Sequence, residues 1–416
     1  MIATSSLPLG ETVNEGYLFG NLGVFTFAGR FFLLFAAGAM FGRVMGDSGA
    51  AASIAMVLVR RLGAHRALWI TVLASALLTY GGVVVFVVIF AMYPLGLRLL
   101  KEANIPKRLF CAALALGAGT FTLTALPGTP SIQTIIPTLT LGTDLYAAPL
   151  LGLVGGAIMF GLGMAYLEWQ RGKAQAAGEG FDPAPGDPVG GDTAEDGESL
   201  PPVLLALLPL LVVIAIIIAP RLLTGAMPAM LAEFAQAQPV MWPSIALVVG
   251  SLLGLVLFPA VRRQPLLVAG EGIQDSIVPL MATSVVIGFG GVVVQTAGFG
   301  GFASALVSFD QYPLLSMFGA VSTVSGITGS ASGGLQIFMQ TMSQDYLAMG
   351  IAPEELHRLV VMASGGFDSL PHCGAVIAML AITRLSHKQA YRDVAVVTVI
   401  IPVIATLCCI ALATVI

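Results

Sequence analysis

Long apolar segments constrain the fold of this chain more than any other feature. They lie at 23–45, 66–98, 109–125, 146–168, 201–220, 240–260, 277–294, 312–349 and 393–415. Only 10% of the residues are charged, whereas soluble domains have about 25%, so the chain cannot cover a water-exposed surface. Since one bilayer crossing needs about 20 apolar residues, there is room for roughly ten to a dozen crossings. We expect an all-α polytopic membrane protein and exclude a soluble enzyme, a nucleic-acid binder and a disordered protein.

The segment 169–200 interrupts this apolar pattern. It is rich in Gly, Pro, Ala and Asp, and between Ala174 and Leu200 it contains no Lys or Arg. Its acidic residues are Glu179, Asp182, Asp187, Asp192, Glu195, Asp196 and Glu198. Such composition predicts a flexible cytoplasmic linker between a first membrane half, 1–168, and a second, 201–416. Without these acids the remaining chain is slightly basic.

The two halves repeat the same landmarks. The matching pairs are 41–42 with 289–290 (Phe-Gly), 105–106 with 352–353 (ending in Pro), and 125–127 with 369–371 (ending in Leu-Pro). The spacing between the members of each pair varies by no more than four residues. We therefore predict an internal duplication.

Basic residues indicate how the halves are oriented, because Lys and Arg collect on the cytoplasmic side of membrane proteins. The segment 66–98 has basic residues at both ends and Gly81-Gly82 near its middle. This pattern predicts a re-entrant hairpin from the cytoplasm, since each arm is too short to cross a bilayer. The segment 312–349 has acidic flanks and predicts a hairpin from the outside, so the halves would be inverted repeats. Arg358 fits this scheme poorly, because it would lie near the outer surface.

Each half also has three helix interruptions, and these correspond between the halves. The pairs are 46–49 with 295–298, 79–82 with 328–333, and 120–131 with 365–374. Non-helical backbone at membrane depth is tolerated only inside protein or facing a cavity, and paired breaks are typical of transporter sites. For the second and third pairs we favour a substrate site over a packing kink. For the first pair a simple loop is an equal alternative.

Helices that restart at such breaks present free N–H groups and a partial positive charge, which suits an anion. The breaks also carry hydroxyl and amide groups that can bind a substrate. The candidate substrate-binding residues are Thr79, Gly81, Gly82, Thr129, Ser131, Gln133, Thr328, Ser330, Ser332 and Gln336. A site rich in hydroxyls and poor in fixed cations favours a small hydroxylated carboxylate over a phosphate ester or a polyanion.

Three titratable residues at the breaks are candidates for proton coupling. Asp47 and Asp368 are acids inside apolar sequence, and His372 has an ordinary pKa near 6.5. For His372 an equal alternative is a structural polar residue that orders the break. For Asp47 it is local neutralisation by Arg43, four residues earlier.

Motifs for other chemistries are missing from the sequence. There is no nucleotide-binding P-loop, no metal-ligand spacing and no nucleophile with an activating base. We expect no metal, no cofactor and no enzymatic activity. Of the four cysteines, Cys373 is the one near the candidate site.

Five sequence stretches resemble the gluconate permease family of proton symporters, within the ion transporter superfamily. They are FGRVMGDSGAAASI (41–54), TYGGVVVF (79–86), ALPGTPSIQTIIPTLTLGT (125–143), GITGSASGG (326–334) and ASGGFDSLPHCGAV (363–376). The resemblance implies proton-coupled import of gluconate or a related hydroxy acid across a bacterial inner membrane. It also implies inverted repeats, re-entrant hairpins, a homodimer and elevator-type movement.

The family pattern has about two more helices before 25–45, so the first half is expected to be shortened. Two alternatives to a proton symporter remain open. One is sodium coupling, either with a carboxylate or as Na⁺/H⁺ antiport. The other is a truncated membrane scaffold that does not transport.

Overall fold

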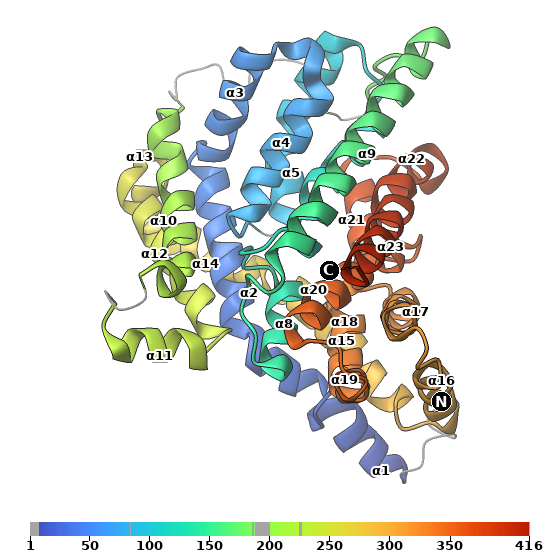
Figure 1. The fold of residues 1–416 in the computed structure, drawn as a ribbon. Coiled ribbons are helices and arrows are strands. Elements are labelled where there is room, and N and C mark those ends of the chain that lie inside the picture. The colour runs from blue at the N-terminus through green and yellow to red at the C-terminus, as the bar shows by residue number, and fades with distance from the viewer. Residues whose placement is uncertain (1–7, 84, 185–186, 188–199, 224–226, 416) are drawn as a thin grey trace.

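The computed structural model describes residues 8–83, 85–184, 187, 200–223 and 227–415. Within these residues the chain is helical and forms no strand (Figure 1). The helices before the acidic segment are α1 (Leu9–Glu11), η2 (Thr12–Phe19), α2 (Val24–Asp47), α3 (Ala50–Leu62), η3 (Ala64–Arg66), α4 (Ala67–Tyr80), α5 (Val85–Ala103), α6 (Lys107–Gly119), α7 (Phe121–Thr124), α8 (Ile132–Leu141) and α9 (Pro149–Ala176).

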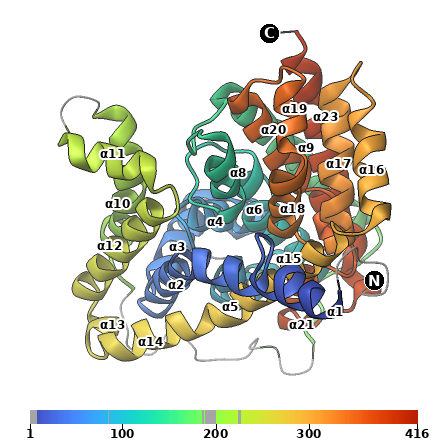
Figure 2. The same cartoon turned by 90° about the horizontal axis from the view of Figure 1, so that it is seen from below.

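The helices after it begin with α10 (Val203–Leu222), α11 (Ala229–Ala237), α12 (Met241–Leu257), α13 (Pro259–Arg262), α14 (Pro265–Asp275), α15 (Ile277–Val293), α16 (Ala297–Val307) and α17 (Pro313–Thr328). They continue with α18 (Ala331–Thr341), α19 (Ser343–Ala348), α20 (Pro353–Ser364), η4 (Phe367–Ser369), α21 (Gly374–Ile382), α22 (His387–Ala395), η5 (Val396–Ile400) and α23 (Ile401–Ala413). Figures 1 and 2 place α10 to α13 on one side of the molecule and α16, α17 and α23 on the other.

Among the described residues, five helical stretches are long and apolar enough to cross a membrane. They are Leu9–Asp47, Pro149–Ala176, Val203–Pro220, Pro265–Val293 and His387–Ala413. Two bent pairs, Ala229–Ala237 with Met241–Leu257 and Pro353–Ser369 with Gly374–Ile382, raise the count to seven at most. Ten to a dozen crossings was therefore an overestimate, because several apolar segments form short or broken helices.

Two helical hairpins form where glycines interrupt apolar sequence. The first consists of α4 and α5, and Gly82 at its tip has φ +98°, a conformation that favours glycine. The second consists of α17 and α18, with Gly329 at φ +59°. In Figure 1 the base of the first hairpin, which is the end away from its tip, lies near the C-terminal ends of α3 and α9. At the base of the second hairpin α18 continues into α19, at the opposite end of the molecule.

Two further helical segments are interrupted by a break and do not form a hairpin. Residues between α6 and α8 form the short α7 and a turn that ends at Ser131, whose side chain caps α8 by accepting from Thr134 N. Residues between α20 and α21 form the short η4, and the two flanking helices are bent by 55°. These breaks coincide with the third predicted pair. We call them the first break (120–131) and the second break (365–374).

Small residues allow the long helix α2 to pack closely on its neighbours. A Cβ at Gly272 of α14 would lie 2.7 Å from Met40 Cα, and one at Gly254 of α12 would lie 2.5 Å from Val44 Cγ1. Glycines at such crossings are typical of membrane helix packing, because they let two backbones approach. Helix α2 is thereby fixed between α12 and α14.

The first part of the acidic segment is bound to the helices, not free. Helix α9 continues to Ala176, and beyond it the Asp187 carboxylate accepts from Lys107 Nζ at 2.6 Å and from the Tyr93 hydroxyl at 2.8 Å. Glu179 accepts two hydrogen bonds from Arg108, both at 2.7 Å. The expectation of a fully flexible linker is therefore wrong for this part. Asp192, Glu195, Asp196 and Glu198 lie outside the described residues.

These contacts have a defined pH dependence. The hydrogen bonds from Arg108 lower the pKa of Glu179. Burial alone would raise the pKa of Asp187, but Lys107 and Tyr93 hold it below its ordinary value. Since both pKa values are lowered on folding, the contacts are complete above the ordinary carboxyl pKa of about 4 and weaken only as the pH falls through the lowered values.

Replacing Asp187 with Asn should release position 187 and the described residues before it, 177–184, from the helices. The variant leaves the buried Lys107 ammonium without its counter-charge, which costs about 3–5 kcal/mol. Hydrogen–deuterium exchange at pH 7 should speed up at the amides of this segment. Asp182→Asn, at an exposed acid of the same segment, is the control and should exchange like the unmodified chain. Equal exchange in both variants would contradict the docking.

Candidate functional site

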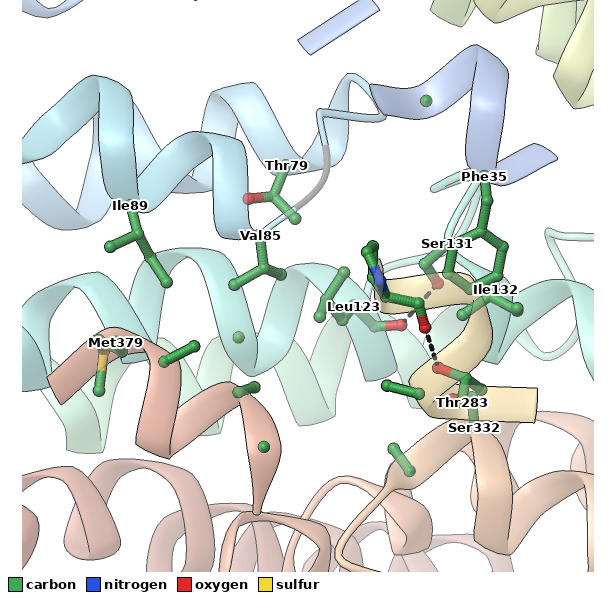
Figure 3. A pocket seen from close by; sticks show the side chains of 18 of the residues that line it. Phe35, Thr79, Val85, Ile89, Leu123, Ser131, Ile132, Thr283, Ser332 and Met379 are labelled. Atoms are coloured by element: carbon green, nitrogen blue, oxygen red, sulfur yellow. Dashed lines mark hydrogen bonds between the residues drawn. The ribbon is translucent and has the colours of Figure 1, made fainter. Parts of the chain in front are cut away.

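One large cavity of about 1260 Å³ lies where the breaks meet. Its wall includes the tips of both hairpins, the two helix breaks, and parts of α2 and α15 (Figure 3). The lining residues named in Figure 3 include Phe35 of α2, Thr79 of α4, Thr283 of α15 and Met379 of α21. Segments far apart in the sequence therefore build one site.

Four helices begin at this cavity. Their first residues, Val85 of α5, Ile132 of α8, Ala331 of α18 and Gly374 of α21, all line it. The first N–H groups of a helix have no partner within the helix and carry a partial positive charge. Several such helix starts around one space create an environment that favours an anion.

Most of the predicted site residues meet at the cavity. Those that line it are Thr79, Gly82, Ser131, Gln133, Ser330, Ser332, Asp47 and Asp368. Ser131 and Ser330 also cap α8 and α18, accepting from Thr134 N at 3.3 Å and Gly333 N at 3.2 Å. Their hydroxyls thus both start the helices and face the space.

The other predicted residues lie away from the cavity wall. They are Gly81, Thr129, Thr328, Gln336 and His372. A Cβ at Gly81 would lie 1.7 Å from Leu210 Cδ2, so this glycine permits packing against α10. The Thr328 hydroxyl donates to Val324 O at 2.9 Å within its own helix. Thr129 Oγ1 and Gln336 Oε1 are buried without a hydrogen-bond partner in the structure.

His372 and Asp368 do not hydrogen-bond to each other. The His372 ring makes a 3.0 Å hydrogen bond to Gly326 O, which ties the second break to the tip of the second hairpin. Asp368 accepts from the Ser369 hydroxyl at 3.1 Å, and none of the ion pairs between described residues involves it. Asp368 is thus an acid on the cavity wall without a basic partner in the described chain.

Asp47 belongs to a charged cluster at one wall of the cavity. Arg43 Nε donates to Asp47 at 2.7 Å, Nη1 to Asp275 at 3.0 Å, and Nη2 to Glu271. One guanidinium therefore faces three carboxylates from α2 and α14. Sequence analysis identified the Arg43–Asp47 pair but missed Glu271 and Asp275, whose spacing of four residues just before the apolar segment 277–294 was the available signal.

Comparison with known proteins shows the family of the chain. Residues 19–415 match the model of the GntP permease family. The chain belongs to this family. It is 43% identical over 396 residues to the uncharacterized transporter YxjC of Bacillus subtilis (strain 168), covering 89% of this chain and 83% of that protein. Family membership and the apolar helices together make the chain a membrane transporter.

Two cavity glycines of this GntP permease should respond differently to alanine. Gly82→Ala forces a side chain into a left-handed conformation, at a cost of about 1–2 kcal/mol, and places its Cβ 2.6 Å from Leu247 Cδ2. A Cβ at Gly374 meets no atom within 4 Å. We expect a lower melting temperature for Gly82→Ala and an unchanged one for Gly374→Ala in detergent. Equal melting temperatures would argue against this tip geometry.

Proposed function

We propose that this permease is a proton-coupled symporter that carries gluconate or a related sugar acid or small hydroxycarboxylate across the bacterial inner membrane. The observation that carries the proposal is the meeting of four helix starts and Asp368 at one cavity. The cavity exceeds the roughly 300–1,000 Å³ of common ligand sites, so a sugar acid fits with accompanying water.

The polar groups of the cavity match a hydroxylated carboxylate. Arg43 is the one Lys or Arg among the described lining residues, and each of its three side-chain nitrogens donates to a carboxylate. The carboxylate of the substrate would therefore depend on N–H groups at the helix starts. The hydroxyls of Thr79, Ser131 and Ser332 would bind those of the substrate.

Electrostatics gives a reason for proton coupling. A substrate carboxylate that enters a cavity with ionised Asp368 meets a like charge, which disfavours binding. Protonation of Asp368 removes that repulsion, so the proton and the anion favour each other's binding. In this mechanism Asp368 releases its proton when the substrate leaves. Asp47, held by Arg43, would contribute less, and His372 would order the break.

For the architecture we propose two inverted repeats with elevator-type movement in a homodimer. The repeated landmarks and the opposite positions of the hairpin bases in Figure 1 support the inversion. The hairpins and broken helices would move together against a scaffold that includes α2 and α12. Alternating access would then expose the cavity to each side in turn.

Asp368→Asn should separate proton coupling from binding. In proteoliposomes the unmodified permease should accumulate labelled gluconate or 3-hydroxybutyrate when a pH gradient is imposed. The variant should lose gradient-driven uptake by about tenfold or more, while substrate exchange without a gradient falls much less. Asp345→Asn, at an exposed acid away from the cavity, should keep both activities. Equal loss of both activities in Asp368→Asn would contradict a proton role.

Sodium coupling is the second candidate, because Na⁺ binds carbonyl and hydroxyl oxygens and both hairpin tips supply them. Replacement of sodium by choline in the same assay distinguishes the two. Uptake that continues in choline and follows the pH gradient supports proton symport. Uptake that stops in choline supports sodium coupling, and no uptake of any hydroxy acid supports a scaffold that does not transport.

A further inference from the structure

Arg358 is the residue that fits the sequence scheme least well. Its side chain is buried in α20, with an exposed fraction of 0%. None of the ion pairs between described residues includes it. The Asp144 carboxylate acts on this guanidinium electrostatically but is not in salt-bridge contact with it. A buried guanidinium with no directly paired carboxylate is costly unless its N–H groups are hydrogen-bonded. Its hydrogen bonds therefore indicate its role.

The guanidinium of Arg358 donates three hydrogen bonds to backbone carbonyls. Nε donates to Ala147 O at 3.0 Å, Nη1 to Ala125 O at 3.1 Å, and Nη2 to Leu145 O at 3.0 Å. Ala125 follows α7 at the first break, and the other two residues precede α9. A lysine has a single nitrogen on a flexible stem and cannot reproduce this planar arrangement of donors. We refer to this set of contacts as the three-carbonyl contact.

The three-carbonyl contact joins the turn between α7 and α8 to the helix that precedes the second break, and both breaks line the cavity. Helix α20, which carries Arg358, leads directly to Asp368. Ala125 begins the turn that leads to Ser131 and the start of α8, and the Tyr80 hydroxyl holds the same turn by donating to Pro127 O at 2.9 Å. Arg358 thus links the backbone before α8 to the helix before Asp368.

Gly152 of α9 leaves room for this contact. A Cβ at Gly152 would lie 2.5 Å from Ala125 O and 3.2 Å from Arg358 Nε. Backbone atoms cannot yield as easily as the end of a flexible side chain, so an alanine here must displace the turn or the guanidinium. Gly152→Ala therefore disturbs the three-carbonyl contact without removing the positive charge.

We propose that Arg358 is a positioning residue of the transport site, which sets the position of Asp368 relative to the start of α8. This inference rests on the proposed function, in which the substrate anion lies between these two groups. Arg358 touches no substrate and acts through the two breaks. Its loss should therefore weaken substrate binding and coupling, not only stability.

Cys408 is exposed, so the test uses a Cys408→Ser background in which it cannot react with a thiol reagent. In this background we compare Arg358→Lys and Gly152→Ala, with Gly161→Ala as the matched control. Gly161 lies on the same helix, and a Cβ there meets no atom within 4 Å. Both test variants should still purify as monodisperse protein in detergent. Both should raise the KM for substrate exchange by about tenfold with a smaller change in maximal rate, and Gly161→Ala should change neither.

A second readout does not depend on transport. Cys373 lines the cavity just after Asp368 and is 5% exposed, whereas Cys111 and Cys409 are buried away from it. Its reaction rate with a water-soluble thiosulfonate should change severalfold in both test variants and stay unchanged in Gly161→Ala. If gluconate uptake fails in every protein but these rates change, the proposed substrate is wrong and the positioning role stands.

Three outcomes would overturn the inference. One is an unchanged KM and an unchanged Cys373 rate in Arg358→Lys or in Gly152→Ala. Another is a failure of both variants to fold, which would mean that the three-carbonyl contact only stabilises the fold. A KM effect in Arg358→Lys alone would also overturn it, because Gly152→Ala disturbs the same contact.

Discussion

Polar backbone groups freed by a helix break must find partners where no water is available, and the cavity of this permease depends on that constraint. At the first break the chain meets it with its own side chains. The Thr120 and Thr122 hydroxyls donate to Leu116 O and Gly117 O, and Ser131 donates to Leu123 O. Arg358 and Tyr80 donate to carbonyls further along the turn. With its carbonyls satisfied in this way, an apolar segment can end one helix and begin another at depth.

The carbonyl groups and the N–H groups at the breaks differ in where they find their partners, and this difference determines which backbone groups the cavity receives. Carbonyl groups at the break are bonded within the protein, whereas the first N–H groups of α8, α18 and α21 begin at the cavity wall. The cavity therefore receives backbone N–H donors from several helix starts. Arg43 is the one basic residue among the described lining residues, and the helix starts add positive potential without further Lys or Arg.

The sequence predicted the breaks well, because Gly and Pro lower helix stability and so mark the points where an apolar segment stops being helical. Ser131, Ser330 and Asp368 were found in this way. Which side of a break faces the cavity depends on tertiary packing. The sequence pattern therefore did not separate Ser131 and Ser330, which line the cavity, from Thr328 and Gln336, which do not. Glu271 and Asp275 lie more than 220 residues from Arg43 in the chain, and local patterns do not reveal such pairs. The number of crossings was overestimated because apolar composition does not distinguish a spanning helix from a broken one.

The docked part of the acidic segment affects how this protein can be divided. Asp187 binds Tyr93 of α5 and Lys107 of α6, and the same Tyr93 hydroxyl lies 3.1 Å from Thr383 O at the end of α21. The segment thus belongs structurally to the body of the first half. Two of its partners also contact the second half, Tyr93 at Thr383 O and Arg108 at Asp393 of α22. A split protein, expressed as two polypeptides, should keep Asp187 on the N-terminal piece. A cut or an inserted tag between 177 and 187 would remove an internal counter-ion, although composition alone marks that region as a dispensable tether.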